Sequence, residues 1–353
     1  MRVRFFLQEN LDPTLSLAID RFFLHAGRQP GEAVLRVYSF PGDVILVGRY
    51  HALGELPDVG QITVARRLTG GRVVPAGQGF VQFSLFLPHR SAFFSDEPYN
   101  LAPFQVLNRY ARPILQGLKA EGIEVFYPGR DLLTVRQQPL GWISFTTEED
   151  GALLCEGGLA VCRDLSLLPY LLDRADPQGM IPSQFFTSGQ VTSLGRLTAK
   201  PVAFTRVAMM LRRGFAQYPG LELVDQGLNG EEQVAISVLA QSRSSREWSQ
   251  SRPLRADLPL RATTATQLGV LQVRFALTAE KTLADVQFSG DLIANPAAIT
   301  ALEQGLCGCL LEREALWRVV DQIFLQPPHY LLGVGPLQTI PDTILKGYAS
   351  SEK

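Results

Sequence analysis

The sequence predicts an α+β protein made of a large domain and a smaller α+β unit at the C-terminal end. Its 353 residues exceed the length that one hydrophobic core usually serves. A polar, proline-terminated segment, residues 243–253, separates two regions that both mix β-rich runs with helical apolar patterns. We therefore expect a large domain over 1–245, a linker over 246–259 and a small domain over 260–353.

The large domain is expected to begin with a short N-terminal strand and a helix. Apolar residues recur at helical spacing over 15–23, directly after Asp12-Pro13, which is a favourable cap and first-turn pair. A second amphipathic pattern over 100–121 ends before Gly122 and predicts a long helix. Runs rich in Val and Phe, bounded by Gly, Pro or Asp, predict strands at 33–40, 44–47 and 81–87.

The same criteria apply to the rest of the chain. Further strands are expected at 125–126, 132–135, 142–145 and 152–161, and helices at 165–172, 202–217 and 231–242. Beyond the linker, alternating patterns predict strands at 271–277 and 283–288, followed by helices at 296–306 and 312–322. Strands and helices that share one short region suggest a separate α+β unit.

Composition excludes several classes of function. An apolar content of 46% with 19% charged residues is typical of a soluble protein, and no apolar run approaches the ~20 residues of a membrane span. The apolar start of the chain is too short for a secretory signal, so we expect a cytoplasmic protein. Net charge is −1 and basic residues are scattered, which argues against nucleic acid. Four cysteines and four histidines lack metal-site spacing, so no metal centre is expected.

One glycine-rich segment stands out. Arg66 and Arg67 run into Gly70 and Gly71, ahead of an alternating apolar stretch. Paired glycines let the backbone approach a bound group closely, and the arginines supply fixed positive charge, so the segment could cradle a phosphate or carboxylate. Taken alone, a glycine pair between two apolar runs is more often an ordinary hairpin turn.

The segment Arg66-Arg-Leu-Thr-Gly-Gly71 resembles the Arg-Arg-x-Ser/Thr-Gly-Gly signature of lipoate-protein ligases, in the biotin/lipoate ligase superfamily. Other segments resemble the family in order and spacing. These are Asp12–Asp20, Asp43–His51, Gly129–Thr134, Gly151–Leu159 and Gly189–Leu194, with Phe288–Leu292 and Ala301–Leu306 similar to the accessory domain of two-domain ligases.

This resemblance implies a mixed β-sheet flanked by helices and a ligase chemistry. Such proteins activate lipoate or octanoate with ATP and Mg²⁺ to an acyl-adenylate and pass the acyl group to a lysine of a lipoyl carrier domain. The implied partners are that carrier domain and the small acyl substrate. The residues implied to line the acyl-adenylate site are Arg67, Thr69, Gly70, Gly71, Gly77, Gly79, Asp131 and Gly141.

The chain departs from the family at the catalytic lysine, which offsets negative charge during adenylation. Aligning on Asp131 and Gly141 places Gln138 there, and no lysine lies between Lys119 and Lys200. Losing one such contact commonly costs about 10²–10³-fold in rate. Residues 76–80 and the Cys155-Glu156 pair also replace family polar positions.

The sequence therefore leaves open whether this protein is an active enzyme. The leading interpretation is lipoyl or octanoyl transfer with substituted active-site residues. The alternative is a catalytically degenerate ligase fold that binds a carrier domain or acyl-adenylate without catalysis. A third possibility is transfer of another acyl group in a pocket narrowed by Trp142, although an aromatic residue there is more often core. Biotin ligation fits less well, because the Gly-Arg-Gly-Arg type of loop is absent.

Overall fold

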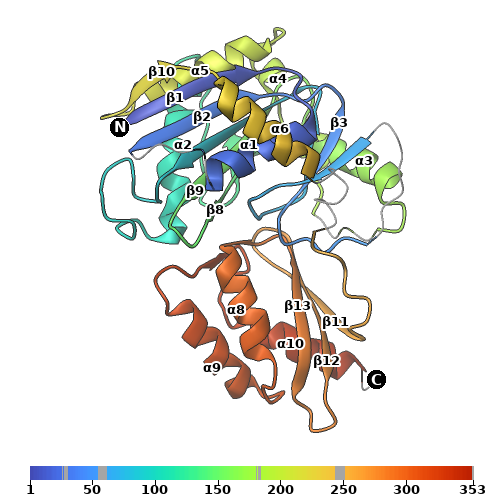
Figure 1. Ribbon diagram of the computed structural model, residues 1–353. Helices are drawn as coiled ribbons and strands as arrows, with labels where there is room; N and C mark the ends of the chain where they lie inside the picture. Colours follow the sequence, from blue (N-terminus) through green and yellow to red (C-terminus); the bar gives the residue numbers. More distant parts are fainter. Residues whose placement is uncertain are drawn as a thin grey trace.

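The computed structural model describes residues 1–25, 27, 31–54, 62–179, 181, 184–242 and 251–351. Figure 1 shows an upper body formed by the first two thirds of the chain and a lower body, coloured orange to red, formed by the C-terminal part. Residues 246–250 of the expected linker lie outside the described residues. Among the described helices, none is long and apolar enough to cross a membrane.

A seven-stranded mixed sheet forms the upper body, with strand order β10-β1-β2-β6-β9-β8-β7. Strand β1 pairs in parallel with β10 and β2, and the pairs from β2 to β7 are antiparallel. The strands are β1 (Arg2–Gln8), β2 (Glu32–Tyr38), β6 (Phe80–Leu87), β7 (Leu132–Val135), β8 (Gln138–Thr147), β9 (Leu153–Ala160) and β10 (Glu222–Asp225). The predicted mixed sheet is confirmed.

Helices cover both faces of this sheet. Helices α2 (Pro103–Lys119) and α5 (Phe204–Ala216) pack on an apolar face whose core includes Phe83, Leu85 and Phe145. Helices α1 (Pro13–His25) and α6 (Gly230–Ser242) pack together on the opposite side (Figure 1). The shorter elements are η1 (Leu165–Leu167), α3 (Leu168–Ala175), η2 (Ser188–Gln190) and α4 (Leu194–Thr198).

A second sheet of three short strands positions the glycine segment. Its order is β4-β3-β5, formed by β4 (Ile62–Arg66), β3 (Asp43–Val47) and β5 (Val74–Gly77). Strands β4 and β5 each pair with β3 and not with each other. The connection over residues 67–73 therefore crosses the end of β3, and the interpretation of Gly70-Gly71 as a hairpin turn is wrong.

The lower body has its own core. An antiparallel sheet of β11 (Leu260–Ala265), β12 (Val270–Leu277) and β13 (Leu283–Gly290) packs with α8 (Pro296–Leu306), α9 (Arg313–Phe324) and α10 (Thr339–Ser351). A two-stranded pair, β14 (Ile293–Ala294) with β15 (Leu331–Leu332), lies next to β8 of the large sheet.

Two expected elements differ from the structure. Residues 125–126 form no strand, because only Phe126 makes an isolated bridge, to Thr134. The helix expected at 165–172 is divided between η1 and α3, with Pro169 near the start of α3, where its missing N–H is tolerated. Strands β4, β5, β10 and β11 and helix α10 were not predicted.

Candidate functional site

Arg67 points from the end of β4 toward the large sheet and is buried. Its Nη2 donates to the carbonyls of Gly70 at 2.8 Å and Arg72 at 2.9 Å, so it braces the loop to which it belongs. Its guanidinium lies 4.3 Å from the ring centroid of Trp142, a cation–π contact. Burial lowers the pKa of Arg67, as expected for a cation removed from water.

Glu156 on β9 contacts the polar side chains of this loop. The Thr69 hydroxyl donates a very short hydrogen bond to its Oε1, and Arg67 Nε lies 3.5 Å from the same oxygen. Burial raises the pKa of Glu156 to about 7, and the nearby charge of Asp20 raises it further against the opposing effect of Arg67. Glu156, one of the departures from the family, thus places a carboxyl group that faces Arg67.

The polar face of the large sheet lies beneath the loop. Strand register places Ser84, Glu156 and Ser144 in one row across β6, β9 and β8. Ser144 Oγ donates to the Gly70 carbonyl at 3.0 Å, which fixes the loop to the sheet. The loop therefore contacts buried side chains of β9 and β8, and Ser84 of β6 continues the same polar row.

The C-terminal part of the chain contacts the glycine pair directly. Gly71 N–H donates to the Leu292 carbonyl at 2.7 Å, and a Cβ at Gly70 would lie 2.1 Å from that oxygen. Gly71 has φ +90°, which favours glycine. The glycines permit a close approach, as expected from the sequence. The group that approaches them, however, is the backbone of Leu292 and not a ligand.

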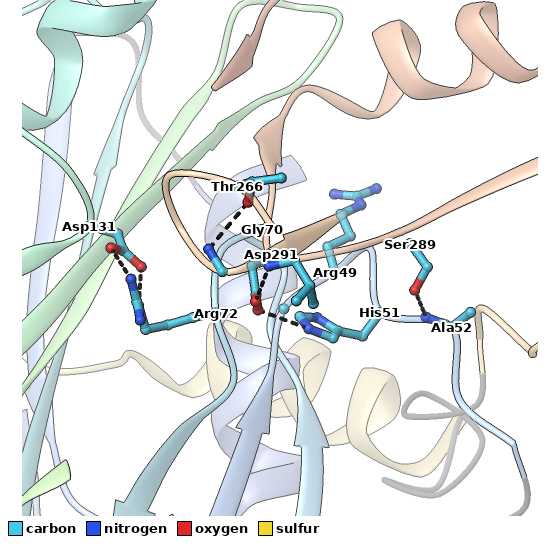
Figure 2. A network of polar contacts seen from close by, with 12 residues as sticks. Arg49, His51, Ala52, Gly70, Arg72, Asp131, Thr266, Ser289 and Asp291 are labelled. Atoms are coloured by element: carbon cyan, nitrogen blue, oxygen red, sulfur yellow. Dashed lines mark hydrogen bonds and ion pairs between the residues drawn. The ribbon is translucent and has the colours of Figure 1, made fainter. Parts of the chain in front are cut away.

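Asp131 lies beside the loop as expected, but it is paired. It accepts two hydrogen bonds from Arg72, Nε to Oδ2 at 2.6 Å and Nη2 to Oδ1 at 2.9 Å, and both residues are buried (Figure 2). Such a bidentate pair uses both carboxylate oxygens in strong, charge-assisted contacts. Asp131 thus anchors the glycine loop next to the start of β7.

Gln138 begins β8 after a tight turn in which Arg136 and Gln137 have φ of 49° and 68°. Its Nε2 donates to the Gly189 carbonyl at 3.0 Å. It lines a cavity of about 500 Å³ together with Phe186, whose ring lies 5.5 Å from the guanidinium of Arg72. Phe186 therefore lies between this cavity and Arg72 of the glycine loop. Arg136 lines the same cavity and is exposed.

Three predicted glycines lie away from the loop. Gly77 and Gly79 flank the turn between β5 and β6, at the other end of β5 from Gly71, and both have positive φ. Gly141 lies within β8, where a Cβ would meet the Gly158 carbonyl at 2.3 Å. The structure therefore brings together Arg67, Thr69, Gly70, Gly71 and Asp131, whereas these three glycines shape turns and strand contacts.

A buried pair next to the loop was not anticipated. His51 Nε2 lies 3.2 Å from Asp291 Oδ1, and Ala52 N–H donates to Ser289 Oγ at 2.8 Å, so the segment after β3 is joined to the C-terminal part (Figure 2). Sequence reasoning had noted Glu156 as a departure from the family. It placed Asp291 and Leu292 in a segment similar to the accessory domain and gave no signal that they contact this loop.

The groups that would hold a nucleotide are already engaged. The Gly71 N–H contacts Leu292, and Arg67 and Arg72 each face a buried carboxyl group. The phosphates of ATP need free donors and uncompensated positive charge, so they would compete with these contacts. Arg67 Nε and Arg72 Nη1 are buried and have no hydrogen-bond partner among the described residues. Within the described part of the chain, no group of three or more His, Cys, Asp or Glu side chains could hold a metal ion.

Comparison with known proteins supplies the family. The lipoyl protein ligase A/B catalytic domain matches residues 12–216. The structure is similar to P. falciparum LipL1 in complex with lipoate, with a TM-score of 0.68, 16% identity and coverage of 98% of this chain and 99% of that one.

It is also similar to the bi-partite lipoate protein ligase of Thermoplasma acidophilum, solved with its E2 lipoyl domain, with a TM-score of 0.56, 18% identity and coverage of 72% and 98%. A lipoate-protein ligase A bound with ATP gives a TM-score of 0.55 at 17% identity, covering 71% and 98%. No curated protein matches. Because the family match extends over more than half of the chain, this protein belongs to the lipoyl protein ligase A/B catalytic-domain family.

Proposed function

We propose that this protein is a catalytically degenerate lipoate-protein ligase that binds a lipoyl carrier domain with its acyl group and forms no adenylate. One observation carries the proposal: the two arginines of the glycine loop are paired with Glu156 and Asp131, and the Gly71 N–H donates to Leu292. Gln138, at the position of the family lysine, is uncharged and bonded to a backbone carbonyl.

The choice of partner is supported by the relatives. One structural neighbour is a ligase solved with its E2 lipoyl domain, and another is a complex with lipoate. A fold can keep one function after it has lost another, because function depends on particular sites and not on the fold itself.

A second candidate is an active ligase that transfers lipoate or octanoate with ATP and Mg²⁺. The retained Arg66-Arg-Leu-Thr-Gly-Gly71 segment favours it. The position of Leu292 also favours an active ligase. Because Leu292 belongs to the C-terminal part, withdrawal of that part would free the Gly71 N–H.

The test is mass spectrometry of a purified lipoyl domain after incubation with the full-length protein, ATP, Mg²⁺ and either lipoate or octanoate. Calorimetric titration of the lipoylated domain is run in parallel. We expect binding of the domain without added acyl mass. Acylation, or lipoate-dependent exchange of pyrophosphate into ATP, would overturn the proposal in favour of the active ligase. Absence of both binding and acylation would overturn both candidates.

The variant Gln138→Lys sharpens the test, because it restores a cation at the family position. Gln137→Lys is the matched control, since it adds the same charge one residue earlier on an exposed turn position. We expect any gain in pyrophosphate exchange to follow Gln138→Lys and not Gln137→Lys. An equal response in both variants would contradict the assignment of Gln138 to the lysine position.

A further inference from the structure

Three arginines from separate segments line one cavity where the two parts of the chain meet. The cavity has a volume of about 290 Å³. Arg49 follows β3, Arg66 ends β4 and Arg252 precedes β11. The other lining residues are Tyr50, Ser251, Pro296, Ile299 and Thr300. This volume lies below the ~300–1,000 Å³ typical of drug-sized ligands, so a small ligand is indicated.

Arg66 supplies the most buried of these charges. It is 1% exposed, and its Nη1 donates to the carbonyls of Gly48, Arg49 and His51. It thus lies on the opposite side of the strand end from Arg67, which contacts Glu156 and Trp142. Burial, followed by the positive charges of Arg252 and Arg49, lowers the pKa of Arg66 to about 9.

The other two arginines are each balanced by one carboxylate. Arg49 Nη1 lies 3.1 Å from Glu148 Oε1, and Arg252 Nη2 lies 2.5 Å from Glu303 Oε1. Arg252 Nε is buried and has no hydrogen-bond partner among the described residues. The cavity therefore has three guanidinium groups against two adjacent carboxylates, and one N–H donor that remains to be satisfied.

The first turn of α8 adds to the positive potential. Pro296, Ile299 and Thr300 line the cavity from this turn. The N-cap residue, Asn295, makes no side-chain cap, because its Oδ1 accepts a hydrogen bond from Tyr330 N–H at 3.3 Å. The partial positive charge of a helix N-terminus favours an anion nearby.

We infer that this cavity is a binding site for a small phosphate-type polyanion of the size of pyrophosphate. Guanidinium groups match phosphate oxygens in geometry and charge, and three of them converge here. The site is separate from the glycine loop, and the titration below uses neither lipoate nor a carrier domain, so the inference does not rest on the proposed function.

The site draws residues from both parts of the chain, which gives the anion a structural effect. Arg49 and Arg66 belong to the upper body, whereas Arg252, Pro296 and Thr300 lead into or belong to the lower one. An anion held between them stabilises the docked arrangement by mass action, because it binds that arrangement and not a separated one.

Isothermal titration of the full-length protein with inorganic pyrophosphate at low ionic strength tests the inference. Thr300→Glu places a like charge in the cavity without removing a buried contact, since Thr300 is exposed. Thr300→Gln is the neutral control of similar size. Arg313→Gln makes the same one-unit change in net charge as Thr300→Glu, at an exposed site elsewhere. Thermal melts of each variant verify folding.

We expect saturable binding of pyrophosphate that weakens with added salt. Thr300→Glu should weaken it about tenfold or more, whereas Thr300→Gln and Arg313→Gln should leave it within about twofold. Absence of binding to the unmodified protein would overturn the inference. Equal binding by Thr300→Glu and Thr300→Gln would also overturn it, because pyrophosphate would then be held elsewhere, such as at the glycine loop.

Discussion

Glu156 shows how one substitution changes an anion cradle at the scale of a single residue. Its buried carboxyl group faces Arg67 and accepts from Thr69, two residues that the family resemblance assigns to the ligand. A carboxyl group in this position competes with any incoming phosphate or carboxylate for the same donors. When Glu156 is ionised, its charge therefore offsets the positive charge of Arg67 that an incoming anion would need.

The stability of the protein should depend on the protonation of Glu156. Its pKa is about 7 in the folded chain and 4.5 ordinarily, so the folded state binds the proton more tightly. The free energy of unfolding then falls as the pH rises from about 4.5 to 7, by up to about 3 kcal/mol. Asp20, whose pKa burial also raises, contributes in the same direction. Urea denaturation across this range measures the slope.

Glu156→Gln keeps an acceptor for Thr69 but does not titrate. We expect a shallower dependence of stability on pH in this variant than in the unmodified protein. An unchanged slope would show that Glu156 is not the group responsible.

Gly70 offers a second test of a single residue. Gly70→Ala would place a methyl group 2.1 Å from the Leu292 carbonyl, so the backbone must move. Overpacking of this kind costs about 1–3 kcal/mol. Gly42→Ala is the matched control, because a Cβ there meets no atom within 4 Å. Denaturation midpoints should fall for Gly70→Ala only, and a similar fall in both variants would contradict the contact.

At the scale of elements, the Arg72–Asp131 pair fastens the β4–β5 connection next to β7. Asp131→Asn should lower the free energy of unfolding by about 3 kcal/mol or more, because it leaves the Arg72 charge buried without a counter-ion. Asp342→Asn breaks the exposed pair with Arg313 and should cost under about 1 kcal/mol. Equal losses in chemical denaturation would show that Arg72 is solvated.

Sequence patterns predicted most of the long elements and missed several short strands and one helix. Helices α2 and α5 have clear apolar stripes, so periodicity found them. Strands β4, β5 and β10 are four or five residues long, too short for a reliable period of two. Helix α10 contains Pro341 and Gly347, which argue against a helix unless packing overrides them.

The candidate site was predictable only where its residues are close in sequence. Arg67, Thr69, Gly70 and Gly71 share one loop, and their proximity follows from the chain itself. The contacts from Glu156 and Leu292 depend on sheet register and on docking of the C-terminal part, which single-sequence patterns do not encode. The pairing of the loop arginines with carboxyl groups could therefore be seen only in the structure.

At the scale of the whole molecule, Tyr330 joins the C-terminal part to the large sheet. Its ring stacks on Phe145 with centroids 5.0 Å apart, and its hydroxyl accepts from Thr147 N–H at 3.0 Å. Tyr330→Ala removes both contacts, whereas Tyr330→Phe keeps the stack. Small-angle X-ray scattering should show a larger radius of gyration for Tyr330→Ala only. Unchanged scattering would mean that other contacts hold the two parts together.

The Leu292 carbonyl makes the C-terminal part an internal competitor for the glycine loop. A ligand that needs the Gly71 N–H can bind only molecules in which this contact has opened. Its measured dissociation constant then equals the intrinsic constant divided by the open fraction. A loop that binds nothing detectable in the intact protein can thus have ordinary intrinsic affinity, and the docking equilibrium of the C-terminal part sets how much of that affinity is observed.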